Sequence, residues 1–323
     1  MIIDILLFVL GIVLIIFGAN SLTDGSAALA RRMGVSRLVV GLTIVALGTS
    51  APELVVSLTS AFKGNADISM GNVIGSNIVN TLFIGGLTAV IAPLSITLST
   101  IRKEIPLMIL ASVVLVAFAL DPLLSGDSSL SMSISRSEGI ALLAFFSIFL
   151  AYTFSIAKAD AIEEEEKRPR VGKPLWVLIA LIIGGLTALV LGGDLFVDAA
   201  SSMARRFGMS EAFIGLTIVA LGTSLPELAT SIVAAMKGEP ELAVGNIVGS
   251  NIFNIFFILG TTATIVPITV SGITALDFTM LCLSALMLYV FGVFFGDRKI
   301  NRYEGAALLV VYLVYNAYLI YNL

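Results

Sequence analysis

The sequence predicts an all-α integral membrane protein of about ten transmembrane helices, built as two five-helix repeats of inverted topology with helices broken at the membrane midplane. Its 323 residues are 58% hydrophobic and 12% charged, and the mean hydropathy is +1.06. A soluble domain is far less apolar than this. Apolar stretches of about 20 residues, long enough to cross a bilayer, recur along the chain. The segment 41–54 (GLTIVALGTSAPEL) returns as 215–228 (GLTIVALGTSLPEL), identical at thirteen of fourteen positions.

The internal repeat extends over much of the chain at a constant offset of 174 residues. The segment 71–80 (GNVIGSNIVN) reappears as 245–254 (GNIVGSNIFN). Three charged positions upstream follow the same offset: Asp24, Arg31 and Arg32 correspond to Asp198, Arg205 and Arg206. We therefore predict a first transmembrane repeat over 1–156, a cytoplasmic linker over 157–173 and a second transmembrane repeat over 174–323.

In chain order, ten stretches qualify as membrane spans. They cover residues 3–23, 37–61, 69–91, 104–122, 137–156, 174–197, 211–235, 243–265, 276–296 and 303–321. The first stretch resembles a secretory signal peptide only superficially, because it has no positively charged start, carries Asp4 and continues past any small-residue cleavage site. We expect it to be the first transmembrane helix.

The distribution of Lys and Arg predicts the orientation of these spans. With the N-terminus outside, fourteen of the 18 Lys and Arg residues fall on the inner side and four on the outer side. This is a strong positive-inside bias, so both termini are expected outside the prokaryotic cytoplasmic membrane. Because each repeat contains an odd number of spans, the second repeat is inverted relative to the first, as in many secondary transporters.

The composition argues against several classes of protein. The net charge is only −4, and no basic cluster indicates nucleic-acid binding. The chain has no histidine and one cysteine, Cys282, so the usual zinc and copper ligands are missing and a membrane hydrolase has no support. The acidic run 163–166 is interpreted as part of a solvated linker, and a regulatory cation site is the open alternative.

The second span is interrupted by the sequence GTSAPE, which ends at Glu53. Pro52 has no N–H, so the carbonyl of Gly48 loses its helical partner. A free carbonyl and an ionisable side chain are both unfavourable inside a bilayer, and a cation bound at the break would stabilise both. Pro226 and Glu227 repeat this arrangement in the second copy.

Further oxygen donors accompany each break at helical spacing. Thr49 stands four residues before Glu53, and Ser76 stands four before Asn80, so each pair shares a helix face. Together with Ser50, these donors recur in the second copy as Thr223, Ser224, Ser250 and Asn254. If the two breaks meet at the midplane, they form a pocket of hard oxygen donors suited to Ca²⁺ and Na⁺. Two glutamates balance one divalent or two monovalent ions.

Two other groups of residues have simpler interpretations. Gly71 and Gly75 are expected to allow close packing between helices. Asp24 and Asp198 fall near helix ends, and we interpret them as capping or snorkelling residues rather than as ion ligands.

The paired GTSAPE and GTSLPE segments, each followed by GNxxGSN, resemble the α-repeats of the cation/calcium antiporter superfamily, most closely those of prokaryotic sodium/calcium exchangers. The resemblance covers the whole chain. It implies a core formed by the second, third, seventh and eighth spans, across which the first and sixth slide to alternate access. It assigns ion contacts to the carbonyls of Ala46 and Ala220 and to the side chains of Glu53, Glu227, Thr49, Thr223, Ser50, Ser224, Ser76, Ser250, Asn80 and Asn254.

The resemblance implies an electrogenic, potassium-independent antiporter, not an enzyme, that exchanges Na⁺ for Ca²⁺ across a lipid bilayer with no cofactor, nucleic acid or obligate protein partner. Asn254 carries the potassium argument, because potassium-dependent relatives and some prokaryotic members have aspartate at this position. The proton-coupled branch has a glutamate where this chain has Gly75 and Gly249. Proton-coupled exchange, potassium-dependent exchange and a passive cation channel remain alternatives.

Overall fold

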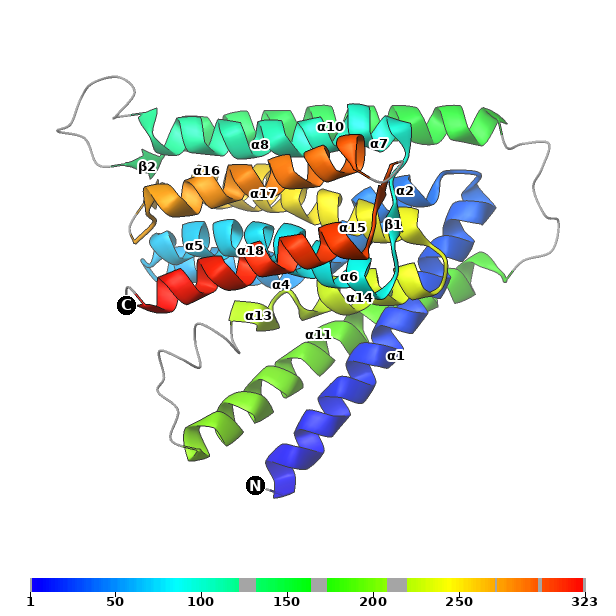
Figure 1. Cartoon of the computed structure of the whole chain (residues 1–323), viewed down its shortest axis with the longest axis horizontal. Coiled ribbons are helices and arrows are strands. Elements are labelled where there is room, and N and C mark those ends of the chain that lie inside the picture. Colours follow the sequence, from blue (N-terminus) through cyan, green and yellow to red (C-terminus); the bar gives the residue numbers. More distant parts are fainter. Residues whose placement is uncertain are drawn as a thin grey trace.

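The structure is a computed structural model that describes residues 2–121, 132–163, 173–207, 220–270, 272–295 and 298–321. This described part is mostly helical, as predicted, and contains four strands of two residues each. Figure 1 shows most helices running along the long axis of the molecule, while α1 (Ile2–Met33) and α11 (Leu175–Arg206) cross it obliquely.

Helices α1 and α11 pack against each other through glycines. A Cβ atom on Gly11 would lie 2.8 Å from the carbonyl oxygen of Gly192, and one on Gly18 would lie 2.7 Å from that of Gly185. Small residues permit this close approach of two helix backbones, which favours association within lipid. At the 174-residue offset Gly11 corresponds to Gly185 and Gly18 to Gly192. The helices therefore cross antiparallel: Gly11 contacts the equivalent of Gly18, and Gly18 contacts the equivalent of Gly11.

Polar contacts secure both ends of this helix pair. Arg206, at the end of α11, lies 3.2 Å from a carboxylate oxygen of Asp4 at the start of α1. Arg32, at the end of α1, donates at 3.0 Å to the carbonyl of Lys173, just before α11. Arg32 and Arg206 are equivalent positions in the repeat, so the same arginine secures each end, through a backbone carbonyl at one end and a carboxylate at the other.

The second predicted span is bent by 44° at Ser50, which confirms the expected break. The part before the bend comprises α2 (Arg37–Val40), η1 (Gly41–Val45) and α3 (Ala46–Thr49), and the part after it is α4 (Ala51–Phe62). Its proline lies in the first turn of α4, where the missing N–H costs nothing. In the second copy, α13 (Ala220–Gly222) and α14 (Leu225–Met236) flank Ser224, whose backbone angles match those of Ser50.

Two long helices follow the breaks, and each changes to π-helical geometry near its centre. The first comprises α5 (Ala66–Ile78), η2 (Val79–Ile84) and α6 (Gly85–Ile91), and the second comprises α15 (Pro240–Ile252), η5 (Phe253–Leu259) and α16 (Gly260–Ile265). Val79 and Phe253, where the π segments begin, are equivalent in the repeat. π segments are common at functional sites, and these contain the predicted ligands Asn80 and Asn254.

Peripheral helices and two small sheets complete the fold. The helices are α7 (Leu98–Arg102), α8 (Glu104–Ala119), α10 (Arg136–Glu163), α17 (Ala275–Phe294) and α18 (Arg302–Tyr321). β1 (Leu94–Ser95) pairs antiparallel with β4 (Lys299–Ile300), and β2 (Ser133–Ile134) pairs antiparallel with β3 (Ile268–Thr269). Each pair therefore joins one strand from 1–156 to one from 174–323. Figure 1 shows β1 and β2 at opposite ends of the long axis.

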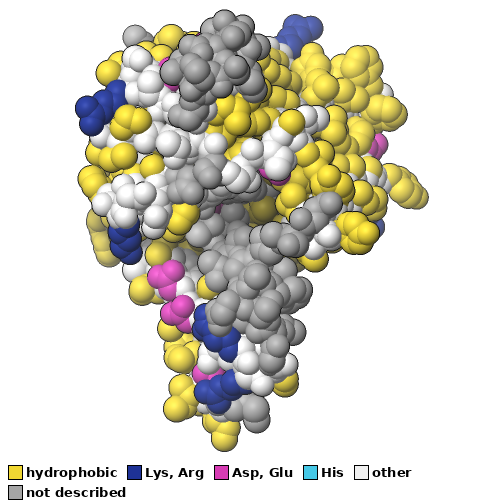
Figure 2. Space-filling view, turned by 90° about the vertical axis from the view of Figure 1, so that its left-hand side faces the viewer, with side chains coloured by type: hydrophobic (Ala, Val, Ile, Leu, Met, Phe, Trp, Pro, Cys, Tyr) yellow, Lys and Arg dark blue, Asp and Glu magenta, His cyan; other side chains and the backbone are white. Residues whose placement is uncertain are grey.

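Within the described residues, seven helices are long and apolar enough to cross a membrane, or eight with the bent pair. Of the other two predicted spans, 104–122 corresponds to the shorter α8, and 211–235 lies partly outside the described residues. The surface agrees with membrane insertion, because large apolar side chains such as Phe17, Trp176 and Phe294 are exposed. On the face drawn in Figure 2, hydrophobic side chains are widespread and charged ones are few.

Candidate cation-binding site

Glu53 and Glu227 lie in the first turns of α4 and α14, immediately after the two breaks, and their exposed fractions are 0% and 1%. A helix N-terminus stabilises a nearby negative charge. The hydroxyl of Ser50 donates to Glu227 Oε1 at 2.9 Å, and that of Ser224 donates to Glu53 Oε1 at 3.4 Å. The breaks therefore meet as predicted, and each carboxylate is held by a serine of the other copy.

Both predicted threonines lie at this meeting point. Thr49 is fully buried, donates to the carbonyl of Val45 at 3.1 Å and lies 3.0 Å from Asn246 Oδ1. Thr223 directly precedes Ser224, whose hydroxyl donates to the Glu53 carboxylate. Each threonine thus adds an oxygen to the surroundings of the carboxylates.

Two asparagines that we did not predict as site residues hold the breaks against the neighbouring long helices. Asn72 donates to the backbone carbonyl of Glu53 at 3.3 Å, and its equivalent Asn246 donates to that of Glu227 at 3.3 Å. Asn246 also donates to Ser231 at 3.0 Å. The signal was present in the sequence, since these asparagines are the second residue of each GNxxGSN segment.

The predicted donors of the long helices extend the polar cluster. Ser250 donates to Glu227 Oε1 at 3.5 Å. Asn254 donates from Nδ2 to Ser76 at 3.1 Å and to Asn77 at 3.0 Å, which leaves its Oδ1 available. Asn77 was not predicted, although it adjoins Ser76 in the same motif.

Four predicted ligands carry buried oxygens that have no hydrogen-bond partner among the described residues. These atoms are Glu53 Oε2, Glu227 Oε2, Asn80 Oδ1 and Asn254 Oδ1. A buried polar atom without a partner costs about 1–3 kcal/mol, and more when it is charged. Carboxylate and amide oxygens are the ligands preferred by Ca²⁺ and similar hard cations, so this donor set fits a bound cation.

The two carbonyls suggested by the family resemblance differ in how far the structure describes them. The Ala46 carbonyl accepts the backbone N–H of Ser50 at 3.0 Å and, in a longer contact, the hydroxyl of Thr49 at 3.4 Å. Ala220 opens α13 and directly follows residues 208–219, which lie outside the described part, so its role as a ligand stays a prediction.

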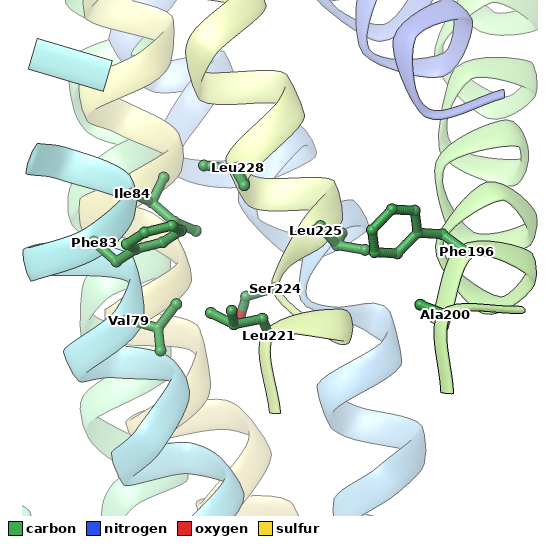
Figure 3. Close-up of a pocket in the computed structure, with 9 residues that line it drawn as sticks. All are labelled: Val79, Phe83, Ile84, Phe196, Ala200, Leu221, Ser224, Leu225 and Leu228. Carbon is green, nitrogen blue, oxygen red and sulfur yellow. The ribbon is translucent and has the colours of Figure 1, made fainter. Parts of the chain in front are cut away.

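A cavity of about 280 Å³ adjoins the cluster at Ser224 (Figure 3). Its other lining residues are apolar: Val79, Phe83, Ile84, Phe196, Ala200, Leu221, Leu225 and Leu228. Figure 3 shows Phe196 of α11 directed toward Leu225 of α14. The cavity thus places α11 beside one approach to the buried carboxylates.

Comparison with known proteins finds chains that are similar over nearly the whole length. The family described as "Sodium/calcium exchanger protein" matches residues 3–155 and 177–321. The "Sodium/calcium exchanger MaX1" of Methanosarcina acetivorans is 29% identical over 99% of both chains, and the "Inner membrane protein YrbG" of Escherichia coli is 38% identical over 81% of this chain and 79% of its own. A solved structure of the sodium-calcium exchanger NCX_Mj superimposes with a TM-score of 0.82 at 30% identity, covering 98% of this chain and 99% of that one.

Proposed function

The chain belongs to the sodium/calcium exchanger protein family, and from this premise we propose that it exchanges Na⁺ for Ca²⁺ by alternating access. Family membership establishes a membrane cation antiporter rather than an enzyme. The observation that carries the specific proposal is the pair of buried glutamates, Glu53 and Glu227, each with one oxygen that has no partner among the described residues. Two adjacent carboxylates balance the charge of one Ca²⁺ or of two Na⁺.

The proposed architecture has ten spans, in inverted repeats over 1–156 and 174–323 joined by a cytoplasmic linker over 157–173, with both termini outside the cell membrane. The positive-inside bias of the loops supports this orientation. The exchanged glycine contacts of α1 and α11 and the crosswise strand pairs support the relation between the repeats.

The proposed ligands are the predicted set: Glu53, Glu227, Thr49, Thr223, Ser50, Ser224, Ser76, Ser250, Asn80, Asn254 and the carbonyls of Ala46 and Ala220. The neutral hydroxyl and amide oxygens outnumber the carboxylates, so the ligand set can hold more than the two Na⁺ that balance one Ca²⁺. We therefore infer that exchange moves net charge and is electrogenic. The absence of a third carboxylate from this ligand set favours potassium independence.

Calcium uptake into proteoliposomes tests the proposal. An imposed sodium gradient should drive ⁴⁵Ca²⁺ accumulation against its own gradient, and an imposed membrane potential should change the initial rate. Accumulation driven by a proton gradient without sodium would instead identify a proton-coupled exchanger. Calcium flow that only follows its own gradient, with no coupling to sodium, would identify a channel.

A further inference from the structure

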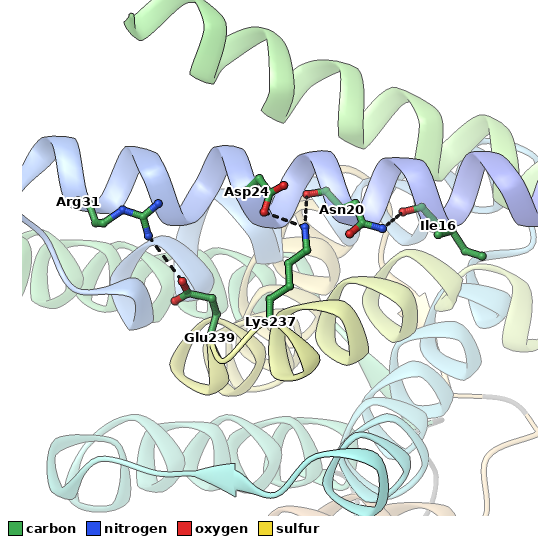
Figure 4. Close-up of polar contacts among 6 residues, drawn as sticks. All are labelled: Ile16, Asn20, Asp24, Arg31, Lys237 and Glu239. Atoms are coloured by element: carbon green, nitrogen blue, oxygen red, sulfur yellow. Dashed lines mark hydrogen bonds and ion pairs between the residues drawn. The ribbon is translucent and has the colours of Figure 1, made fainter. Parts of the chain in front are cut away.

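Three ion pairs connect α1 and α2 to the short turn between α14 and α15, two of them made by α1 and one by α2. Lys237 Nζ lies 2.7 Å from Asp24 Oδ1. Glu239 lies 3.6 Å from Arg31 Nη1 and 2.5 Å from Arg37 Nε. Figure 4 shows Asp24 and Arg31 on one side of α1, directed toward Lys237 and Glu239. Moving α1 away from this turn would break the contacts of Asp24 and Arg31, whereas the contact of Arg37 is made by α2 and does not depend on α1.

Two equivalent residues of the other copy form no ion pair within the described part of the structure. At the 174-residue offset, Asp24 corresponds to Asp198 on α11, and Lys237 corresponds to Lys63 at the end of α4. Both Asp198 and Lys63 are exposed, and no ion pair joins either of them to another described residue. The same two charges are therefore present on both sides of the molecule, but within the described residues they form an ion pair on one side only.

Access to the site shows the same asymmetry. Phe196 and Ala200 on α11 line the cavity that reaches Ser224. Their equivalents on α1 are Leu22 and Ser26, and both have an exposed fraction of 0%. Within the described residues, the side along α1 is thus closed at Leu22 and Ser26, near the Asp24–Lys237 pair, and the side along α11 is hollowed at Phe196 and Ala200, near Asp198.

Because α1 and α11 are joined along their glycines and at both ends, we treat them as one unit. A displacement that separates α1 from the α14–α15 turn would bring α11 toward the equivalent turn between α4 and α5. We propose that Asp24 with Lys237, and Arg31 with Glu239, hold the cation site closed on the predicted cytoplasmic side, and that Asp198 pairs with Lys63 when that side opens. These are positioning residues, since none of them belongs to the cation ligand set.

The two closed arrangements are not equally stabilised, because the position equivalent to Glu239 is Asn65. The pair between Arg31 and Glu239 therefore has no equivalent at Asn65, whereas the pair between Asp24 and Lys237 has an equivalent in Asp198 and Lys63. Partly exposed pairs are individually weak, so the expected bias toward the observed arrangement is about two- to fivefold. This difference between the copies accounts for the side on which the resting structure is closed.

Thiol labelling at two equivalent positions tests the inference. Ser26→Cys and Ala200→Cys are introduced separately into a Cys282→Ala background, and the rate of reaction with a small water-soluble methanethiosulfonate is measured without any ion gradient. We expect slow labelling at position 26 and fast labelling at position 200. Adding Lys237→Gln, or in a second variant Glu239→Gln, should raise the first rate and lower the second, each about two- to fivefold.

Opposite changes distinguish a shift between states from a general loosening, which would raise both rates. Lys237→Arg keeps the charge and should restore the original rates, and Lys63→Gln should not raise labelling at position 26. If both positions label faster in the Lys237 and Glu239 variants, or if neither rate changes, the proposal is wrong. It rests on alternating access, but labelling uses no transported ion, so this outcome is separate from failure of sodium-calcium exchange.

Discussion

Glu53 and Glu227 each combine burial, a helix N-terminus and a serine from the other copy. A carboxylate in such a place is costly without a cation and useful with one. Neither forms an ion pair with another described residue, which leaves their charge available to a transported ion. At the residue scale, the site is therefore defined by charge as much as by shape.

The first prediction concerns these charges. Glu53→Gln and Glu227→Gln should each reduce sodium-driven ⁴⁵Ca²⁺ uptake by about a hundredfold or more, because the amide keeps the shape but loses a charge that a divalent ion needs in a site shielded from water. The matched control is Glu304→Gln, because Glu304 only accepts the backbone N–H of Asn301 at 2.9 Å, which an amide oxygen can also do. Normal uptake by either site variant would remove that glutamate from the ligand set.

The second prediction concerns Asn254, whose Oδ1 has no partner among the described residues. Its neutral amide leaves two carboxylates in the proposed site, enough for Ca²⁺ but not for an extra monovalent ion bound beside it. Calcium uptake should proceed at the same rate when choline replaces potassium on both sides of the membrane. Asn254→Asp should change the ion dependence toward potassium or, since three adjacent carboxylates repel one another, toward proton binding. A wild-type rate that collapses in choline would contradict this.

At the scale of elements, the contact between α1 and α11 depends on the absence of side chains at a few positions. A Cβ atom on Gly185 would lie 2.7 Å from the backbone nitrogen of Leu22, and neither helix backbone yields easily. The neighbouring Gly184 is exposed, and nothing described lies within 4 Å of its Cβ position. The two adjacent glycines therefore have different roles.

The third prediction uses this difference. Gly185→Ala should destabilise the helix pair by about 1–3 kcal/mol through overpacking and should slow transport. Gly184→Ala should be neutral or slightly stabilising, because alanine is the better helix former. Apparent melting temperatures in detergent and initial uptake rates measure both effects. Equal effects from the two substitutions would show that the close approach of the helices is unimportant.

At the scale of the whole molecule, the two small sheets mark opposite ends of the bundle, and each joins residues of both repeats. The proposed topology places the β1–β4 sheet on the same side as the linker 157–173 and the β2–β3 sheet on the side of the termini. An inverted repeat requires this arrangement, because equivalent loops of the two halves must emerge on opposite faces.

The fourth prediction tests that arrangement. In a Cys282→Ala background, Thr269→Cys and Lys299→Cys should react with a membrane-impermeant maleimide from opposite faces, the first from outside intact cells and the second only after permeabilisation. Both side chains are exposed in the structure. Glu165→Cys, in the part of the linker outside the described residues, should behave like Lys299→Cys. Labelling of positions 269 and 299 from the same face would contradict the inverted topology.

The sequence by itself determined the helical membrane class, the bend at Ser50 and the residues that surround it, because composition, proline and acidic residues act locally. The internal repeat made these signals clearer, since each occurs in both copies. It also showed the extra asparagines Asn72 and Asn246 without revealing their role. Tertiary structure alone decided that each glutamate is held by the serine of the other copy, since that contact joins residues more than 170 positions apart. Tertiary structure also decided which side is closed, because two similar halves can pack differently. Only this packing places Lys237, and not its equivalent Lys63, beside an aspartate of the other repeat.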